Sequence, residues 1–111
     1  MRKIEVVASP IMMDSIKLAL AKAKPGTMLL VDARGAGPGV SQPATYRGMS
    51  YLADVERVLL RLVVADGAVD STIQALCDAA HEFKSGEIDV TVAPLEDVFR
   101  IRSTPAGARV D

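Results

Sequence analysis

The chain of 111 residues has one cysteine, one histidine and no tryptophan. A single cysteine cannot form an intramolecular disulfide, and one cysteine with one histidine gives no recognisable metal-ligand spacing. Only two tyrosines and two phenylalanines are present, so few rings are available to stack on nucleic-acid bases. These absences argue against a disulfide scaffold, a metalloprotein and an RNA-binding sheet.

The chain also lacks a charge excess and a long apolar run. Thirteen basic and fourteen acidic residues give a formal net charge of −1, whereas a nucleic-acid-binding domain usually carries a basic stripe. No apolar stretch reaches the roughly 18 residues that a membrane helix needs. The first residues do not form the apolar segment of a signal peptide. We therefore expect a cytoplasmic protein without membrane insertion.

No residue pattern indicates catalysis. The single histidine, His81, lies late in a predicted helix, and we connect it to no Cys-His, Asp-His or Ser-His-Asp pattern of a catalytic site. Asp66, Asp70 and Asp78 have the spacing of helix caps and solvent-exposed helix positions rather than of an acid–base pair. We expect that the protein is not an enzyme and holds no metal or catalytic cofactor.

Apolar residues are what the chain has in excess. Hydrophobic residues make up 50% of the sequence, and the mean hydropathy is +0.24. A single domain of this size buries only about 65% of the surface that its unfolded chain exposes. Part of the apolar surface is therefore expected at an interface, and we interpret residues 1–111 as one self-associating domain.

The hydrophobic periodicity predicts the order β-α-β-β-α-β. Strands are expected at 2–8, 27–34, 56–64 and 88–92, with one helix from Ser9-Pro10 to about Lys24 and a second whose apolar face runs from Val69 to Ala80 and which includes His81. This order is typical of the ferredoxin-like α+β sandwich. Both helices would cover one sheet face, and self-association into a closed cyclic oligomer would cover the other.

Two of these elements carry more specific expectations. On the second helix, one apolar face contains Val69, Ile73, Leu76, Cys77 and Ala80. Cys77 is expected to be buried there as a small hydrophobic residue. In strand 56–64, Val58, Leu60, Leu62 and Val64 share the face that belongs to the core. The alternate residues form a mixed face that suits a cleft or a neighbouring subunit.

Three segments do not follow this periodicity. Residues 35–54 are rich in Gly, Pro and Ser and predict a long irregular loop, which in a compact domain is usually functional. Its start, Gly35-Ala36-Gly37-Pro38-Gly39, suits either a phosphate-contacting backbone or a plain flexible loop. Arg100 and Arg102 alternate in a short extended segment, where they suit either a phosphate or the protection of a strand edge. The tail 103–111 has the composition of a frayed end.

Four segments resemble the PII family of signal-transduction proteins, which are small trimeric sensors of adenine nucleotides. They are Tyr46-Arg47-Gly48 with Tyr51, Met28–Gly37, Arg57–Val64 and Phe99–Arg102. The resemblance covers residues 1 to about 104. It implies a homotrimer that binds nucleotide in clefts between subunits. It also implies that a loop of about 36–54, the T-loop, reports the bound ligand to a target protein.

The resemblance also implies which residues contact the nucleotide. Backbone groups near Val7 and Val63 would recognise the adenine. The phosphates would be contacted near Gly35, Gly37, Gly86, Arg100 and Arg102. The T-loop motif consists of Tyr46, Arg47, Gly48 and Tyr51. In part of the family a tyrosine equivalent to Tyr51 is modified with a nucleotide, but this loop is altered and one residue shorter, so we do not predict the modification.

Four departures from the family pattern change the expected ligand. Leu29 replaces a threonine that faces the adenine, and Asp89 replaces a lysine that pairs with the distal phosphates. Pro38 and Gly39 replace an arginine and a magnesium-supporting glutamine. An aspartate near a partly buried triphosphate exchanges attraction for repulsion, a change of about 1–4 kcal/mol. ADP or AMP is therefore expected to bind better than ATP, and 2-oxoglutarate sensing is not expected.

The remaining pattern resembles divergent PII-like proteins that read ADP or AMP, some of them associated with inorganic-carbon uptake or carboxysomes. That resemblance suggests bicarbonate as a second ligand. It leaves the target protein unidentified. A ligand-free trimeric interaction or scaffold module of the same fold is the alternative function.

Overall fold

The computed structural model describes residues 1–22, 26–36, 42–83, 86–101, 103 and 108–109. The elements follow one another as β1 (Arg2–Ala8), the 3₁₀ turn η1 (Pro10–Met12), α1 (Met13–Ala21), β2 (Leu29–Gly35), β3 (Gln42–Tyr46), β4 (Met49–Ala53), β5 (Val55–Val64), the 3₁₀ turn η2 (Asp66–Ala68), α2 (Val69–Ala80), β6 (Ile88–Pro94), β7 (Phe99–Arg100) and β8 (Ala108–Arg109).

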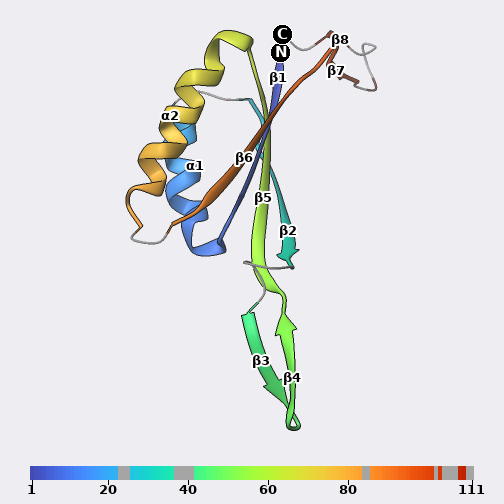
Figure 1. Ribbon diagram of the computed structural model, residues 1–111. Helices are drawn as coiled ribbons and strands as arrows, with labels where there is room; N and C mark the ends of the chain where they lie inside the picture. Colours follow the sequence, from blue (N-terminus) through green and yellow to red (C-terminus); the bar gives the residue numbers. More distant parts are fainter. Residues whose placement is uncertain (23–25, 37–41, 84–85, 102, 104–107, 110–111) are drawn as a thin grey trace.

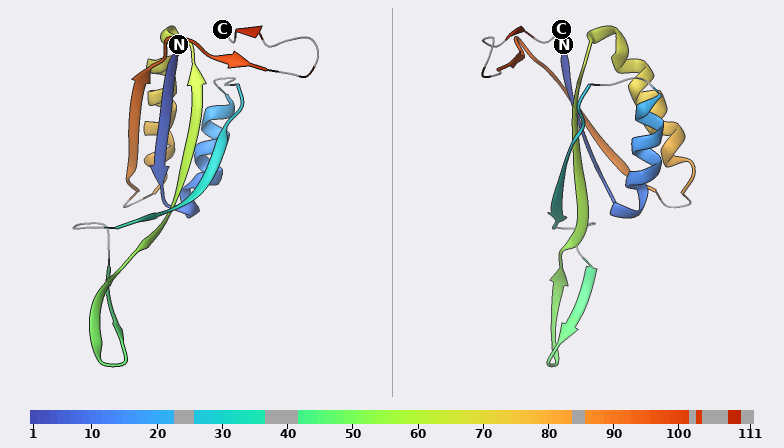
Figure 2. Two further views of the ribbon diagram at one scale, coloured as in Figure 1. Left: turned by 90° about the vertical axis from the view of Figure 1, so that its right-hand side faces the viewer. Right: turned by 180° about the vertical axis from the view of Figure 1, so that it is seen from behind.

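Four of the strands form one antiparallel sheet in the order β2-β5-β1-β6. Both helices lie on the same face of this sheet, and no described element covers the other face (Figure 1). The left view of Figure 2 looks onto the uncovered face, with the helices behind the strands. The predicted ferredoxin-like α+β sandwich is therefore confirmed, with each predicted strand and helix shifted by no more than a few residues.

The core lies between the sheet and the helices, and its pattern is the one that strand alternation predicts. Val58, Leu60, Leu62 and Val64 on β5 are buried, with exposed fractions of 8, 0, 1 and 7%. Across the sheet, Ile4 and Val6 of β1 are also buried, and α1 adds residues at helical spacing, namely Met13, Ile16 and Leu20. Met12 and Met13, at the start of the first helix, are buried in the same core.

On α2 the buried stripe runs through Thr72, Leu76 and Ala79. Cys77 is exposed, so the prediction that it is buried was wrong. The stripe explains the error, because Leu76 lies at its centre and Cys77 is turned about 100° further around the helix axis. His81 forms the exposed C-terminal cap position of α2, in agreement with its predicted place at a helix end.

The residues at the starts of the two helical segments do not make the capping interactions that the sequence suggests. Ser9 occupies the cap position before η1 with extended backbone, but its side chain makes no capping hydrogen bond. Asp66 is not a cap, since Ala65 takes that position before η2. The carboxylate of Asp66 instead lies 3.1 Å from the N-terminal ammonium group and 3.5 Å from Nε of Arg2. The expected solvent-exposed roles of Asp70 and Asp78 agree with the exposure of both residues.

The segment predicted as an irregular loop contains a β-hairpin. β3 and β4 pair in register from Gln42–Ala53 to Tyr46–Met49, which leaves the two-residue turn Arg47-Gly48. Both turn residues have positive φ, 51° and 79°, as a type I′ turn requires. The hairpin projects beyond the end of the main sheet (Figure 1). It makes the chain 60 Å long and raises the radius of gyration to 17.2 Å, against about 13 Å for a compact domain of this size.

The C-terminal segment is also partly ordered into strands. β7 pairs with β8 in a separate two-stranded sheet, Phe99 opposite Arg109 and Arg100 opposite Ala108. The expectation of a frayed tail over 103–111 is therefore wrong for residues 108–109, which regain a strand partner. Residues 104–107 and 110–111 lie outside the described part of the chain.

Candidate functional site

The uncovered side of the main sheet, here called the open face, presents side chains from all four strands. The strand registers place directly opposed residues on the same face, for example Val7 with Asp89 and Leu29 with Arg61. Its residues include Lys3, Glu5, Val7, Leu29, Val31, Leu59, Arg61, Val63, Asp89 and Thr91.

The open face is strongly apolar on the β2 and β5 side. Leu29 is 51% exposed and Val31 is 44% exposed, while Leu59 and Val63 are half-buried. Leaving such surface in water costs roughly 25 cal/mol for each Å². Covering this face would therefore be favourable, and the mixed face predicted for strand 56–64 stays a prediction of either a cleft or a subunit contact.

One charge cluster lies near the middle of the open face. Oε1 of Glu5 is 3.1 Å from Nζ of Lys3 and 3.7 Å from Nε of Arg61. Glu5 and Arg61 are directly opposed on β1 and β5, so the sheet register brings the pair together. Sequence reasoning missed this cluster, although Lys3 and Glu5 alternate on one strand, a spacing that places both on the same face.

The residues predicted to contact nucleotide fall into two groups at opposite ends of the sheet. Val7 and Gly35 lie toward the hairpin end, since Val7 is opposed to Leu59 and Gly35 to Val55. Gly86 belongs to the same group, because it precedes β6, which starts opposite Ala8, the last residue of β1. Gly37, also predicted for this group, lies outside the described residues.

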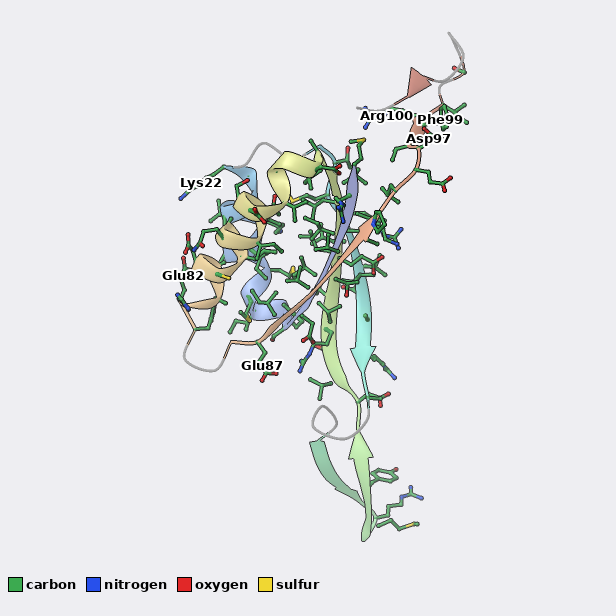
Figure 3. The ribbon with its side chains drawn as sticks, turned by 45° about the horizontal axis from the view of Figure 1, so that its top comes forward. Lys22, Glu82, Glu87, Asp97, Phe99 and Arg100 are labelled. Carbon is green, nitrogen blue, oxygen red and sulfur yellow. The ribbon has the colours of Figure 1, made fainter. Side chains whose placement is uncertain are left out.

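The second group lies toward the chain termini. Val63 is opposed to Lys3, four residues along β5 from the partner of Val7, which is about 13 Å at the rise of a strand. Arg100 lies beyond the end of β6 and is exposed, whereas Arg102 lies outside the described residues. Figure 3 shows the separation through Glu87, next to Gly86, and Arg100, which lie at opposite ends of the domain body. One subunit does not bring the two groups together.

Gly86 has a packing role that sequence reasoning missed. A Cβ atom at this position would lie 2.8 Å from Cε of Met12 and 2.9 Å from Cβ of Phe83. Its N–H donates a hydrogen bond of 3.4 Å to the carbonyl oxygen of Phe83. The connection from α2 to β6 therefore packs closely against η1, which fixes where β6 begins beside Val7.

Next to Gly35, the ends of β2 and β5 line a cleft of about 570 Å³. Its polar lining has both signs of charge, Asp32 and Glu56 against Arg34 and Arg57. Arg34 is partly neutralised by Asp54, 3.9 Å away, and Arg57 donates a 2.9 Å hydrogen bond to the carbonyl oxygen of Glu56. This mixed lining does not by itself favour an anion.

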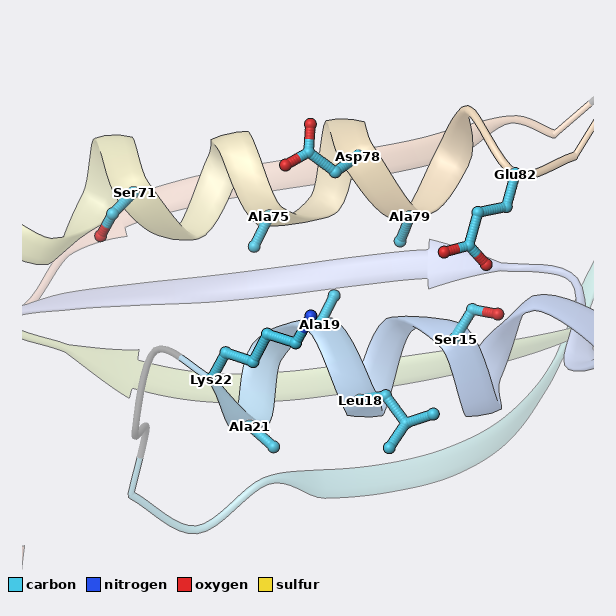
Figure 4. A pocket seen from close by; sticks show the side chains of 10 residues that line it. All are labelled: Ser15, Leu18, Ala19, Ala21, Lys22, Ser71, Ala75, Asp78, Ala79 and Glu82. Atoms are coloured by element: carbon cyan, nitrogen blue, oxygen red, sulfur yellow. The ribbon is translucent and has the colours of Figure 1, made fainter.

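Two further hollows lie on the helix side. The larger, of about 790 Å³, runs between α1 and α2 and is lined mainly by small side chains, with Lys22, Asp78 and Glu82 at its edges (Figure 4). The other, of about 530 Å³, lies between α2 and β6 and includes Cys77 and His81. Across residues 1–22, 26–36, 42–83, 86–101, 103 and 108–109, no three His, Cys, Asp or Glu side chains are grouped as metal ligands.

The T-loop motif lies at the hairpin tip. Tyr46 ends β3, Arg47 and Gly48 form the turn, and Tyr51 lies in β4 opposite Ala44. The guanidinium carbon of Arg47 is 5.3 Å from the centroid of the Tyr46 ring, within the range of a cation–π contact. The motif residues are therefore presented far from the domain body.

Comparison with known proteins agrees with this architecture. The family model described as nitrogen regulatory protein P-II matches residues 1–105. The chain belongs to the PII family. It is 32% identical over 108 residues to the nitrogen regulatory protein P-II of Azospirillum brasilense, with 96% of each chain covered. It is 31% identical over 104 residues to the P-II protein of Synechocystis sp., with 93% of each covered.

Membership of the PII family confirms the resemblance seen in the sequence. It supports a role as a regulator in signal transduction and nitrogen regulation, and at the level of the family it supports the expectation that the protein is not an enzyme. No described helix is long and apolar enough to span a membrane. The cytoplasmic location stays a prediction.

Proposed function

We propose that this PII protein is a homotrimeric sensor that binds adenine nucleotides in the clefts between subunits and signals through its T-loop. The observation that carries the proposal is the division of the site. Val7, Gly35 and Gly86 lie at one end of the sheet and Val63 and Arg100 at the other. A neighbour that brings its second group against the first group of this chain would complete the site, and closed symmetry would repeat it in each cleft.

The uncovered open face supports the same assembly. Its exposed apolar residues, including Leu29 and Val31, need a partner, and another copy of the chain carries a matching surface. The cluster of Lys3, Glu5 and Arg61 is already internally paired, so it can enter an interface with less unbalanced charge. Light scattering is expected to give a mass three times the 11.8 kDa of the chain. A monomer at micromolar concentration would contradict the trimer.

Asp89 supports a preference for ADP or AMP over ATP. It is exposed and lies directly opposite Val7, in the group that also holds Gly35 and Gly86, which are proposed to contact the phosphates. A carboxylate so close to the site repels each added phosphate, and the penalty is largest for the triphosphate. Bicarbonate as a second ligand at the base of the T-loop, and a link to inorganic-carbon uptake or carboxysomes, belong to the same proposal.

Calorimetry with AMP, ADP and ATP, each with and without magnesium, tests the nucleotide preference. We expect ADP or AMP to bind most tightly, and Asp89→Lys to improve ATP binding about fivefold or more, since one reversed charge is worth at least ~1 kcal/mol here. Asp78→Lys, the same charge reversal on the exposed face of α2, is the control and should leave the order unchanged. Tightest binding of ATP with magnesium by the unaltered protein would refute the preference.

Absence of nucleotide binding in this calorimetric titration would favour the alternative function. If a trimer forms but no adenine nucleotide binds, the ligand-free scaffold function is the correct one. Both functions predict the trimer, because both need the open face covered. Only the sensor predicts heat on addition of nucleotide and its loss in an Arg100→Ala variant.

A further inference from the structure

The two long edges of the T-loop hairpin differ in their backbone groups. In a hairpin with a two-residue turn, the residues that flank the turn, Tyr46 and Met49, are a hydrogen-bonded pair. Hydrogen-bonded and non-bonded pairs then alternate along an antiparallel ladder. The backbone groups of Thr45 and Pro43 on β3, and of Ser50 and Leu52 on β4, therefore point away from the hairpin.

Proline makes the β3 edge a poor partner for another strand. Pro43 lies at an outward position and has no N–H, so the outer edge of β3 keeps one of its two donors, that of Thr45. The outer edge of β4 keeps both donors and both acceptors, at Ser50 and Leu52. An added strand can bond fully to β4 and only partly to β3.

The composition of the two strands differs in the same direction. Exposed strand edges are usually protected by charged residues, proline or a bulge. Residues 49–53 of β4 contain no charge, no proline and no glycine, and within the described chain β4 pairs with β3 alone. β4 is thus an unprotected edge on the most projecting part of the domain (Figure 1).

We propose that the outer edge of β4 binds an extended segment of the target protein as a third strand. This inference rests on the proposed signalling function and specifies the contact that the T-loop makes. Unpaired N–H and C=O groups at strand spacing recognise extended backbone, not a helix. Tyr46 and Met49, 62% and 74% exposed at the tip, provide apolar contact where the added strand begins.

The probe for this site is a nine-residue peptide selected on the intact protein from a displayed random library. Amide hydrogen exchange with and without the selected peptide gives the first readout. We expect added protection at the amides of Ser50 and Leu52 and unchanged exchange at Thr45. Protection confined to the helix side or to Thr45 would overturn the proposal, as would a selection that yields no peptide bound at the hairpin.

A pair of proline variants tests the same contact by affinity. Ser50→Pro removes an outward N–H from β4, and Thr45→Pro, its cross-strand neighbour, removes one from β3. Both leave the inward hydrogen bonds of the hairpin in place, as Pro43 does. Peptide affinity is expected to fall roughly five- to tenfold in Ser50→Pro, the loss of about one backbone hydrogen bond, and to change little in Thr45→Pro. Equal losses in the two variants would overturn the assignment to β4.

Lysine variants at the same two positions keep the backbone N–H groups. They provide the test if proline at either position disturbs the hairpin. Ser50→Lys adds the charge that commonly protects edges and should weaken the peptide more than Thr45→Lys. The other possible occupant of the β4 edge is a second copy of this chain, and sedimentation at rising concentration tests for it. Assemblies larger than the trimer that disappear in Ser50→Pro would show that β4 pairs with another copy, and this result would refute the proposal. Each variant is also titrated with ADP. Loss of peptide binding with ADP binding unchanged concerns the β4 edge alone, whereas absence of ADP binding concerns the proposed nucleotide sensor.

Discussion

Arg47 lies over the ring of Tyr46, with its guanidinium carbon 5.3 Å from the ring centroid, and it does so from a left-handed backbone with φ of 51°. The two facts oppose each other energetically. A non-glycine residue in this backbone region costs roughly 1–2 kcal/mol, while an exposed cation–π contact returns only about 0.5–1 kcal/mol. The hairpin tip therefore keeps an arginine at a position where asparagine or glycine would be more stable.

Replacement of Arg47 tests this balance. Arg47→Asn should stabilise the hairpin or leave it unchanged, because asparagine tolerates the left-handed region and forms type I′ turns readily. Arg47→Ala loses the cation–π contact and keeps the backbone cost, so the hairpin should be less stable by about 0.5–1 kcal/mol. Hydrogen exchange at the inward amides of Ala44 and Tyr51 measures the difference. Higher protection in the alanine variant than in the asparagine variant would contradict it.

Gly86→Ala is expected to destabilise the fold by about 1–3 kcal/mol, the usual cost of overpacking. The added methyl group would lie 2.8 Å from Cε of Met12 and 2.9 Å from Cβ of Phe83. Gly67→Ala is the matched control, since a Cβ at Gly67 meets nothing within 4 Å. Urea unfolding of both variants compares them. Equal midpoints would show that the junction of α2 and β6 is looser than described.

Two neighbouring leucine positions should separate folding from assembly. Leu60→Ala removes a fully buried side chain and should cost about 2–5 kcal/mol of folding free energy. Leu29→Ala removes an open-face side chain that is 51% exposed in the single chain, so it should weaken the trimer much more than the fold. Unfolding curves and sedimentation on both variants provide the two readouts. An intact trimer with a weakened fold in Leu29→Ala would contradict the proposed interface.

Asp66 predicts an acid-sensitive contribution to stability. A hydrogen bond from the N-terminal ammonium group, with the charges of that group and of Arg2, holds the pKa of Asp66 below its usual value. A carboxyl group with a lowered folded-state pKa stabilises the fold at pH values above the unfolded-state pKa, and this contribution is lost as the pH falls through the folded-state pKa.

Thermal melts of the unaltered protein and of Asp66→Asn measure this contribution. The unaltered protein should melt higher near neutral pH, and the difference should disappear at a pH below the lowered pKa of Asp66. It should also shrink with added salt, because the pair is exposed. A difference that persists in strong acid would assign the effect to the side-chain shape rather than to its charge.

The sequence was sufficient for the fold wherever one pattern dominated. Strand alternation in β5 identified the buried residues from Val58 to Val64, and the spacing in α1 and α2 placed both helices. The prediction of Cys77 as buried failed because a residue at the margin of a helical stripe satisfies the same spacing as one at its centre. The role of Asp66 depends on partners far away in the sequence, the N-terminal ammonium group and Arg2, which a local pattern does not contain.

The hairpin was missed for a different reason. Proline inside a strand and arginine in a left-handed turn both argue against a hairpin when read locally. Pro43 is compatible with the strand only because the register turns its missing N–H outward, and the register is a property of the folded pair. For the site, sequence resemblance named Val7, Gly35, Val63, Gly86 and Arg100, but their division between two ends of the sheet appeared only with the strand order.

The direct run of β4 through Asp54 into β5 has a mechanical consequence. β5 is paired on both sides, to β1 and β2, so both of its edges are held by the sheet. The hairpin extends from the start of β5, beyond the last residue pair of the main sheet on that side, Gly35 with Val55. A displacement of a fraction of an ångström at that pair swings the tip by a larger distance, because the tip lies several residue lengths beyond it. A ligand that shifts the backbone at Gly35 is therefore expected to shift Tyr46 and Arg47 by a larger distance.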